Sequence, residues 1–117
     1  MAPYEKLRAW TASHEVVLQV YRVTRTWPEH EKYGLVAQSR RAAFSIAANI
    51  AEGAAKRGKR EFRRFLDIAI GSSAELRCAI RVARDLEYLP EADWKEIESR
   101  RDTAGKLLWR LYESLND

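Results

Sequence analysis

The side chains best suited to chemistry in this sequence are cations gathered into one short stretch, where they could bind phosphate. Six basic residues fall between positions 56 and 64, and Glu61 is the single acid among them. Between Arg40 and Arg64 the local net charge is +6, whereas the whole chain of 117 residues carries +4. Most of these cations are arginines, whose planar group can bind phosphate through two hydrogen bonds.

A second set of cations follows at helical spacing, and we call it the arginine stripe. It consists of Lys59, Arg63, Arg77, Arg81 and Arg84. These residues share a helical sector about 60° wide, which we expect to lie opposite the apolar face. Such a row suits contact with a phosphate backbone, while an ordinary solvated face balanced by nearby acids is the competing interpretation. No aromatic residue interleaves the stripe, so stacking on single-stranded bases is not expected.

The sequence therefore predicts a set of nucleic-acid-binding residues that joins the basic run to the stripe. The set is Arg40, Lys56, Arg57, Lys59, Arg60, Arg63, Arg64, Arg77, Arg81 and Arg84. The absence of a helix-turn-helix or similar signature favours recognition of shape and backbone over recognition of base sequence.

A polar stripe of another kind precedes the basic run. It consists of Gln38, Arg41, Ser45, Asn49 and Glu52, which recur at steps of three and four residues. Gln, Ser and Asn suit specific hydrogen bonds. We expect this stripe to pair with Ser72, Ser73 and Glu75, or with another subunit, and so to fix helix register.

Recognisable catalytic and metal-binding motifs are lacking. We expect His14 to be a hydrogen-bonded core residue, His30 to be exposed in a loop, and Cys78 to be a small core residue. One cysteine allows neither an internal disulfide nor a cysteine-based zinc site, and no Glu-x-x-His pair occurs. The prediction is a protein that is not an enzyme and holds no cofactor or metal. The less favoured alternative is an enzyme site assembled between subunits from Arg41, Asn49, Glu52 and Glu75.

Four amphipathic helices account for the apolar periodicity. We expect them at about 6–26, 34–55, 59–87 and 91–115, separated near Pro28, Gly58 and Pro90. No segment shows the period of two that a strand requires. The prediction is an all-α, antiparallel up-down-up-down four-helix bundle, with residues 1–117 in a single domain.

The periodicity also predicts which side chains face the core. The first helix would use Leu7, Trp10, His14, Val17, Tyr21 and Thr24. The third would use Phe62, Phe65, Ile68, Ala69, Ser72, Leu76, Ala79, Ile80, Ala83 and Leu86. The fourth would bury Trp94, Ile97, Ala104, Leu108, Leu111 and Leu115, with Arg101 as a polar member. The second is rich in alanine, so a neighbouring helix can approach it closely.

The sequence offers no sign of export or of a membrane span. Its first residues are charged and lack a long apolar core, and its longest uncharged run is short. We therefore expect a cytoplasmic protein with no membrane partner.

The segment from Tyr33 to Ile80 resembles the signature of the four-helix bundle proteins encoded in intervening sequences of bacterial 23S ribosomal RNA genes. The matching residues are Gln38, Arg40, Arg41, Ala42, Ser45, Asn49, Ile50, Ala51, Glu52, Gly53, Phe62, Phe65, Gly71, Ser72, Glu75 and Leu76. Trp10, Tyr21 and the link "WPEHEKYGL" agree as well.

The resemblance implies more than a fold, because this family is similar to the accessory variability determinant of diversity-generating retroelements. That relative is a pentamer that binds nucleic acid and works with a reverse transcriptase. The resemblance therefore implies that this protein forms a ring-shaped homo-oligomer, expected to be a pentamer. It also implies RNA or DNA, and a reverse transcriptase or other protein, as partners of this protein. The alternative is an interaction scaffold whose basic face binds an acidic protein, such as a polymerase.

Overall fold

Four long helices and two short 3-10 turns make up the computed structural model, which describes residues 3–116. The turns are η1 (Pro3–Lys6) and η2 (Glu29–Glu31). The helices are α1 (Arg8–Thr24), α2 (Leu35–Ala54), α3 (Lys59–Asp85) and α4 (Glu91–Ser114). No strand occurs among the described residues, so the predicted all-α class is confirmed, and each predicted boundary lies within two residues of the observed one.

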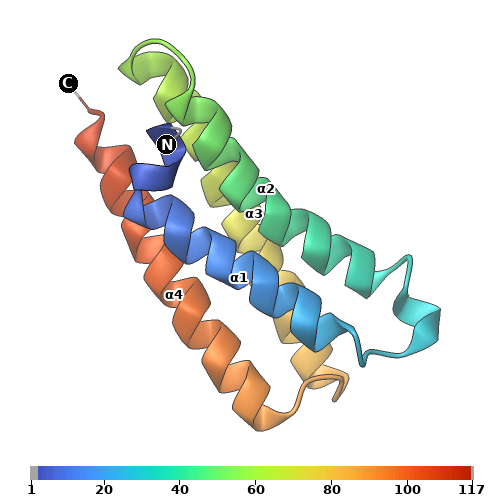
Figure 1. The fold of residues 1–117 in the computed structure, drawn as a ribbon. Helices are drawn as coiled ribbons and strands as arrows, with labels where there is room; N and C mark the ends of the chain where they lie inside the picture. Colours follow the sequence, from blue (N-terminus) through green and yellow to red (C-terminus); the bar gives the residue numbers. More distant parts are fainter. Residues whose placement is uncertain (1–2, 117) are drawn as a thin grey trace.

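The helices pack as a four-helix bundle about 44 Å long and 25 Å wide. Consecutive helices run in opposite directions, and η1 and the end of α4 lie at the same end of the bundle as the turn between α2 and α3 (Figure 1). Each helix contacts its two neighbours, while the diagonal pairs make no close backbone contact within residues 3–116. The closest neighbours are α2 and α3, and the most loosely packed are α3 and α4.

The close approach of α2 and α3 follows from the small side chains of α2. Ala42 and Ala43 are fully buried there, and Gly53 is buried near the helix end. A Cβ added to Gly53 would lie 2.9 Å from Phe65 Cβ and 3.2 Å from the Phe62 carbonyl oxygen. These atoms belong to the α3 backbone or lie next to it, so they cannot easily move aside.

We expect Gly53→Ala to destabilise the protein by about 1–3 kcal/mol, because overpacking outweighs the gain in helix propensity of about 1 kcal/mol. Gly71→Ala is the matched control, since a Cβ there meets no atom within 4 Å, and it should instead stabilise the protein by about 0.5–1 kcal/mol. Urea unfolding of both variants measures the difference. Equal stabilisation by the two alanines would show that α2 and α3 are not in close contact at Gly53.

The face that α1 buries is not the predicted one. Its buried residues include Ala9, Ser13, Val16 and Val20, whereas Trp10 is only partly buried. The larger side chains therefore lie on a flank of α1, and the shorter ones occupy the crowded interior.

The prediction that His14 is a core residue is wrong. His14 is exposed and stacks on Trp10, with ring centroids 4.9 Å apart. Both residues line a groove between α1 and α2. Tyr21, on the same predicted stripe, is also exposed, whereas Thr24 is buried as expected.

Most of the face predicted for α3 is confirmed, because six of its seven buried residues were expected in the core: Phe65, Ala69, Leu76, Ala79, Ile80 and Ala83. The buried face is nevertheless broader than predicted, because α3 packs against α4 as well as α2. Leu66 is fully buried and Ile70 packs against the core, and both lie in the sector of the arginine stripe. The stripe is therefore not opposite the core, as predicted, but beside α4. Ile68 and Leu86, which were expected to be core residues, are about half exposed, and Cys78 is exposed.

The start of α2 is held by a carboxylate from the preceding turn. Glu31 accepts hydrogen bonds from the Leu35 backbone N–H at 3.1 Å and from the Tyr88 hydroxyl at 2.9 Å. The Leu35 bond, followed by the Tyr88 bond, lowers the pKa of Glu31 below its usual value.

Since its folded pKa is depressed, Glu31 stabilises the protein above the usual glutamate pKa, and this contribution is lost as pH falls through the lower, folded value. We expect Glu31→Gln to lower the unfolding midpoint at neutral pH and to converge with the parent protein under acid conditions. Glu29→Gln is the control, because Glu29 is exposed in the same turn. Thermal unfolding measured against pH tests this, and a constant difference down to strongly acid pH would contradict it.

Candidate nucleic-acid interface

The first part of the polar stripe forms an ion pair between α2 and α3. One Nη atom of Arg41 lies 2.7 Å from each carboxylate oxygen of Glu75 and donates to Gln38 Oε1 at 2.9 Å. Both charged side chains are largely exposed, so the pair contributes little to stability. Its geometry nevertheless favours one register between the two helices.

The second part of the stripe is less exposed. The hydroxyls of Ser45 and Ser72 lie 2.8 Å apart, and Asn49 Nδ2 donates to the Ser45 carbonyl at 2.8 Å. Glu52 is exposed and makes no side-chain hydrogen bond within residues 3–116. The polar stripe therefore satisfies most of its hydrogen-bonding groups within one chain.

Four cations gather where α2 turns into α3, and we call them the basic end cluster. They are Lys56, Arg57, Lys59 and Arg60. Gly58 has a φ of +83°, in the left-handed region that glycine adopts without steric cost, and this turn displays the cations at the end of the bundle. All four are exposed, and none forms an ion pair with the described residues. The cluster is therefore available to an external anion.

Other arginines of the predicted set have structural contacts. Arg63 donates to the Leu115 carbonyl at 3.0 Å and to Asn116 Oδ1 at 3.2 Å, which ties α3 to the end of α4. Arg40 donates through Nε to Thr24 Oγ1 at 2.9 Å, at the boundary of α1 and α2. These two guanidinium groups already have protein partners.

Two further members form ion pairs along their own helix. Arg64 lies 3.2 Å from Glu61 and above the ring of Phe65, at 4.5 Å from its centroid. Arg81 lies 3.2 Å from Asp85. Both arginines remain largely exposed, so an anion could still compete for them.

Of the remaining members, Arg84 lies beside an aromatic residue of α4, which corrects the expectation that no aromatic interleaves the stripe, and Arg77 lines a cavity next to the same helix. The guanidinium of Arg84 stands 4.7 Å from the ring centroid of Trp94. Arg77 and Trp109 line the same cavity between α3 and α4. Trp94 and Trp109 come from a helix remote in sequence, so the spacing within α3 carried no sign of them.

Metal and membrane sites are not evident in residues 3–116. The structure places no group of three His, Cys, Asp or Glu side chains where they could hold a metal ion. None of the described helices is both long and apolar enough to cross a bilayer.

Comparison with known proteins gives a family. One solved structure with the same fold is a protein of unknown function from the S23 ribosomal protein family of Bacteroides thetaiotaomicron, with a TM-score of 0.82 and 21% identity over 90% of this chain and 95% of that one. No curated protein matches the sequence. The model of the 23S rRNA-intervening sequence protein family matches residues 5–110. Because this match spans most of the chain, the protein belongs to the 23S rRNA-intervening sequence protein family.

Proposed function

We propose that this protein is a non-enzymatic, homo-oligomeric accessory protein that binds the phosphate backbone of RNA or DNA through the basic end cluster. The observation that carries this proposal is the contrast between that cluster and the other predicted arginines. Four exposed cationic side chains within five residues have no ion-pair or hydrogen-bond partner among the described residues, although Lys56 lies over the Phe65 ring at 5.5 Å from its centroid. Most other members of the predicted set form a hydrogen bond or an ion pair with a protein group. Phosphates would supply the missing negative charge.

The number of copies determines how strong such binding can be. Four phosphate contacts on duplex DNA correspond to a salt slope of about −3 to −4 in a plot of log K against log salt concentration. One copy would therefore bind weakly at physiological salt. Several copies in one ring would repeat the basic end cluster and add their contacts.

Self-association is supported by apolar side chains left exposed on a single copy. Phe44 on α2 is 60% exposed and Ile68 on α3 is 44% exposed. The neighbouring surface of α2 offers alanines, such as the exposed Ala37, which allow another helix to approach closely. A pentamer is the assembly implied by the similarity to the accessory variability determinant.

The test is binding of the purified protein to duplex DNA and structured RNA over a series of salt concentrations, with the mass of the assembly recorded in the same buffers. We expect the protein to bind as an oligomer, and we expect this binding to weaken steeply as the salt concentration rises. An intact oligomer that fails to bind at low salt would overturn the proposal. Capture of an acidic protein that resists nuclease treatment, without nucleic-acid binding, would favour the scaffold alternative.

A further inference from the structure

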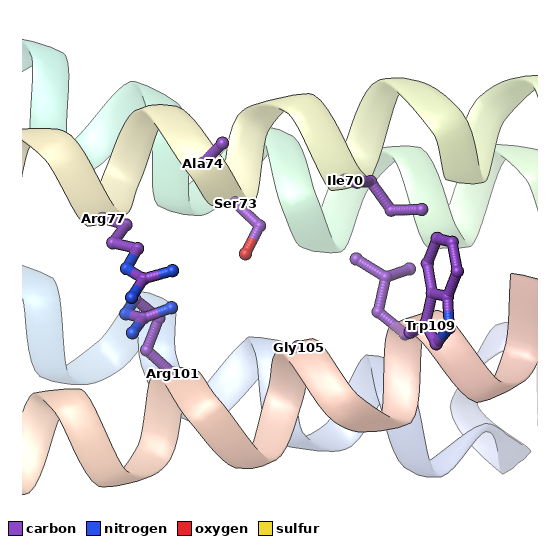
Figure 2. Close-up of a pocket in the computed structure, with 8 residues that line it drawn as sticks. Ile70, Ser73, Ala74, Arg77, Arg101, Gly105 and Trp109 are labelled. Carbon is purple, nitrogen blue, oxygen red and sulfur yellow. The ribbon is translucent and has the colours of Figure 1, made fainter.

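A cavity of about 250 Å³ lies between α3 and α4, away from the basic end cluster. Figure 2 shows Arg77 from α3 and Arg101 from α4 pointing toward one another at one end, and Trp109 standing at the other. Gly105 lies between Arg101 and Trp109 on α4, and Ser73 points into the gap from α3. The cavity therefore has a cationic end, a polar middle and an aromatic end.

The cationic end has more positive than negative charge. Arg101 is only 12% exposed and forms an ion pair with Glu98, with Nη2 2.9 Å from Oε2. Arg77 forms no ion pair within residues 3–116. Glu98 pairs with Arg101 alone, through a second hydrogen bond from Nε to Oε1 at 3.1 Å, and the facing Arg77 is exposed and has no carboxylate of its own among the described residues. The two guanidinium groups carry like charges, which repel one another. A phosphate group between them would relieve this repulsion and accept hydrogen bonds from both.

The middle of the cavity offers hydroxyl groups and open space. A second, small pocket of about 10 Å³ adjoins the cavity, and both Ser73 and Ser13 line it. The Ser13 hydroxyl is 1% exposed and has no hydrogen-bond partner in the described structure, so a donor lies unused beneath the cavity. A Cβ on Gly105 would meet no atom within 4 Å, so the absence of a side chain there keeps the floor open.

The aromatic end offers a stacking surface. Trp109 is 50% exposed and stacks on Tyr112 on one side, with ring centroids 5.6 Å apart and an interplanar angle of 22°. It is eight residues beyond Arg101, or about 12 Å along the helix. This separation is comparable with the extended length of a nucleoside monophosphate, from its phosphate to its base.

We infer that the α3–α4 cavity binds a nucleotide, with its phosphate between Arg77 and Arg101 and its base against Trp109. The phosphate and base could belong to a free mononucleotide or to the 5′-phosphorylated end of a single strand. The inference does not rest on the proposed function, because it uses no residue of the basic end cluster.

Calorimetric titration with four probes tests the site: adenosine 5′-monophosphate, adenosine, inorganic phosphate and a short 5′-phosphorylated single strand. The monophosphate is expected to bind at least about tenfold more tightly than adenosine or phosphate, since it alone engages both ends of the cavity. Binding of the phosphorylated strand without the mononucleotide would assign the site to strand ends. Failure of both to bind at millimolar concentration would overturn the inference.

Variants then locate the bound ligand. Gly105→Leu should abolish binding by filling the cavity, and Arg77→Gln should weaken it by about tenfold through loss of a charged hydrogen bond. Gly71→Leu and Arg81→Gln make the same changes on α3 outside this cavity and should leave binding intact, with helicity checked by circular dichroism. If Arg77→Gln and a correctly folded Gly105→Leu both bind the nucleotide as the parent protein does, the ligand does not occupy this cavity and the inference is overturned. Reversing charges in the basic end cluster should not affect mononucleotide binding, which separates this inference from the proposed function.

Discussion

The triple variant Lys56→Glu, Arg57→Glu and Arg60→Glu is expected to bind duplex RNA and DNA at least about a hundredfold more weakly than the parent protein at low salt. Each substitution removes a phosphate contact and adds a repelling charge. The slope of log K against log salt concentration should become shallower by about 3 for each bound copy. All three side chains are exposed and without ion pairs in residues 3–116, so the fold and the assembly should be unaffected.

The matched control changes the net charge by the same amount at the opposite end of the bundle. Arg22, Arg25 and Lys95 are also exposed and form no ion pair with the described residues. Replacing these three with glutamate should reduce binding only modestly, through the change in long-range field. An equal loss in the two triple variants would show that overall charge, and not the basic end cluster, governs binding. Arg63 is unsuitable for this comparison because it holds the end of α4.

The second large effect concerns stability. Leu66→Ala is expected to destabilise the protein by about 2–5 kcal/mol, because Leu66 is fully buried between α3 and its neighbours and its removal leaves a cavity. Ile68→Ala should cost less than about 1 kcal/mol in a single copy, because Ile68 is 44% exposed. The sequence pattern alone predicts the reverse, since it places Ile68 in the core.

Urea unfolding of both variants at several protein concentrations distinguishes these cases. Similar costs for the two alanines at every concentration would mean that the face assigned to α3 is wrong. A cost for Ile68→Ala that appears only where the protein is assembled would instead identify Ile68 as covered by another copy, because stability gained from association depends on concentration.

The helices and their limits could be predicted from local sequence. Apolar periodicity and the breaks at Pro28, Gly58 and Pro90 depend on steric rules that act over a few residues, and they located every helix to within two residues. The capacity of α2 for close helix packing could also be predicted, because it depends only on the small size of its side chains. The pairing of Arg41 with Glu75 could be anticipated because α2 and α3 are consecutive and antiparallel.

The face of α1, and the part of α3 that packs on α4, were decided by the tertiary structure. Each of these helices touches two neighbours, so its buried surface is broad, and periodicity identifies stripes without saying which adjacent stripe faces the interior. Trp10 was therefore expected inside and lies on a flank, while Leu66 is buried within the sector of the arginine stripe.

Which cations contact other protein groups, and which do not, could be determined only from the tertiary structure. Lys56 and Arg57 lie in a turn, where the residues close in space are also close in sequence. Their exposure could therefore be predicted from the local composition. Arg63 and Arg77 face α4, a helix that begins more than ten residues further along the chain. By itself the sequence determined where positive charge gathers and which segments are helical. Only the packing of α4 against α3 decided which arginines hold the protein together and which line a cavity with Trp109, because those contacts join residues far apart in the chain.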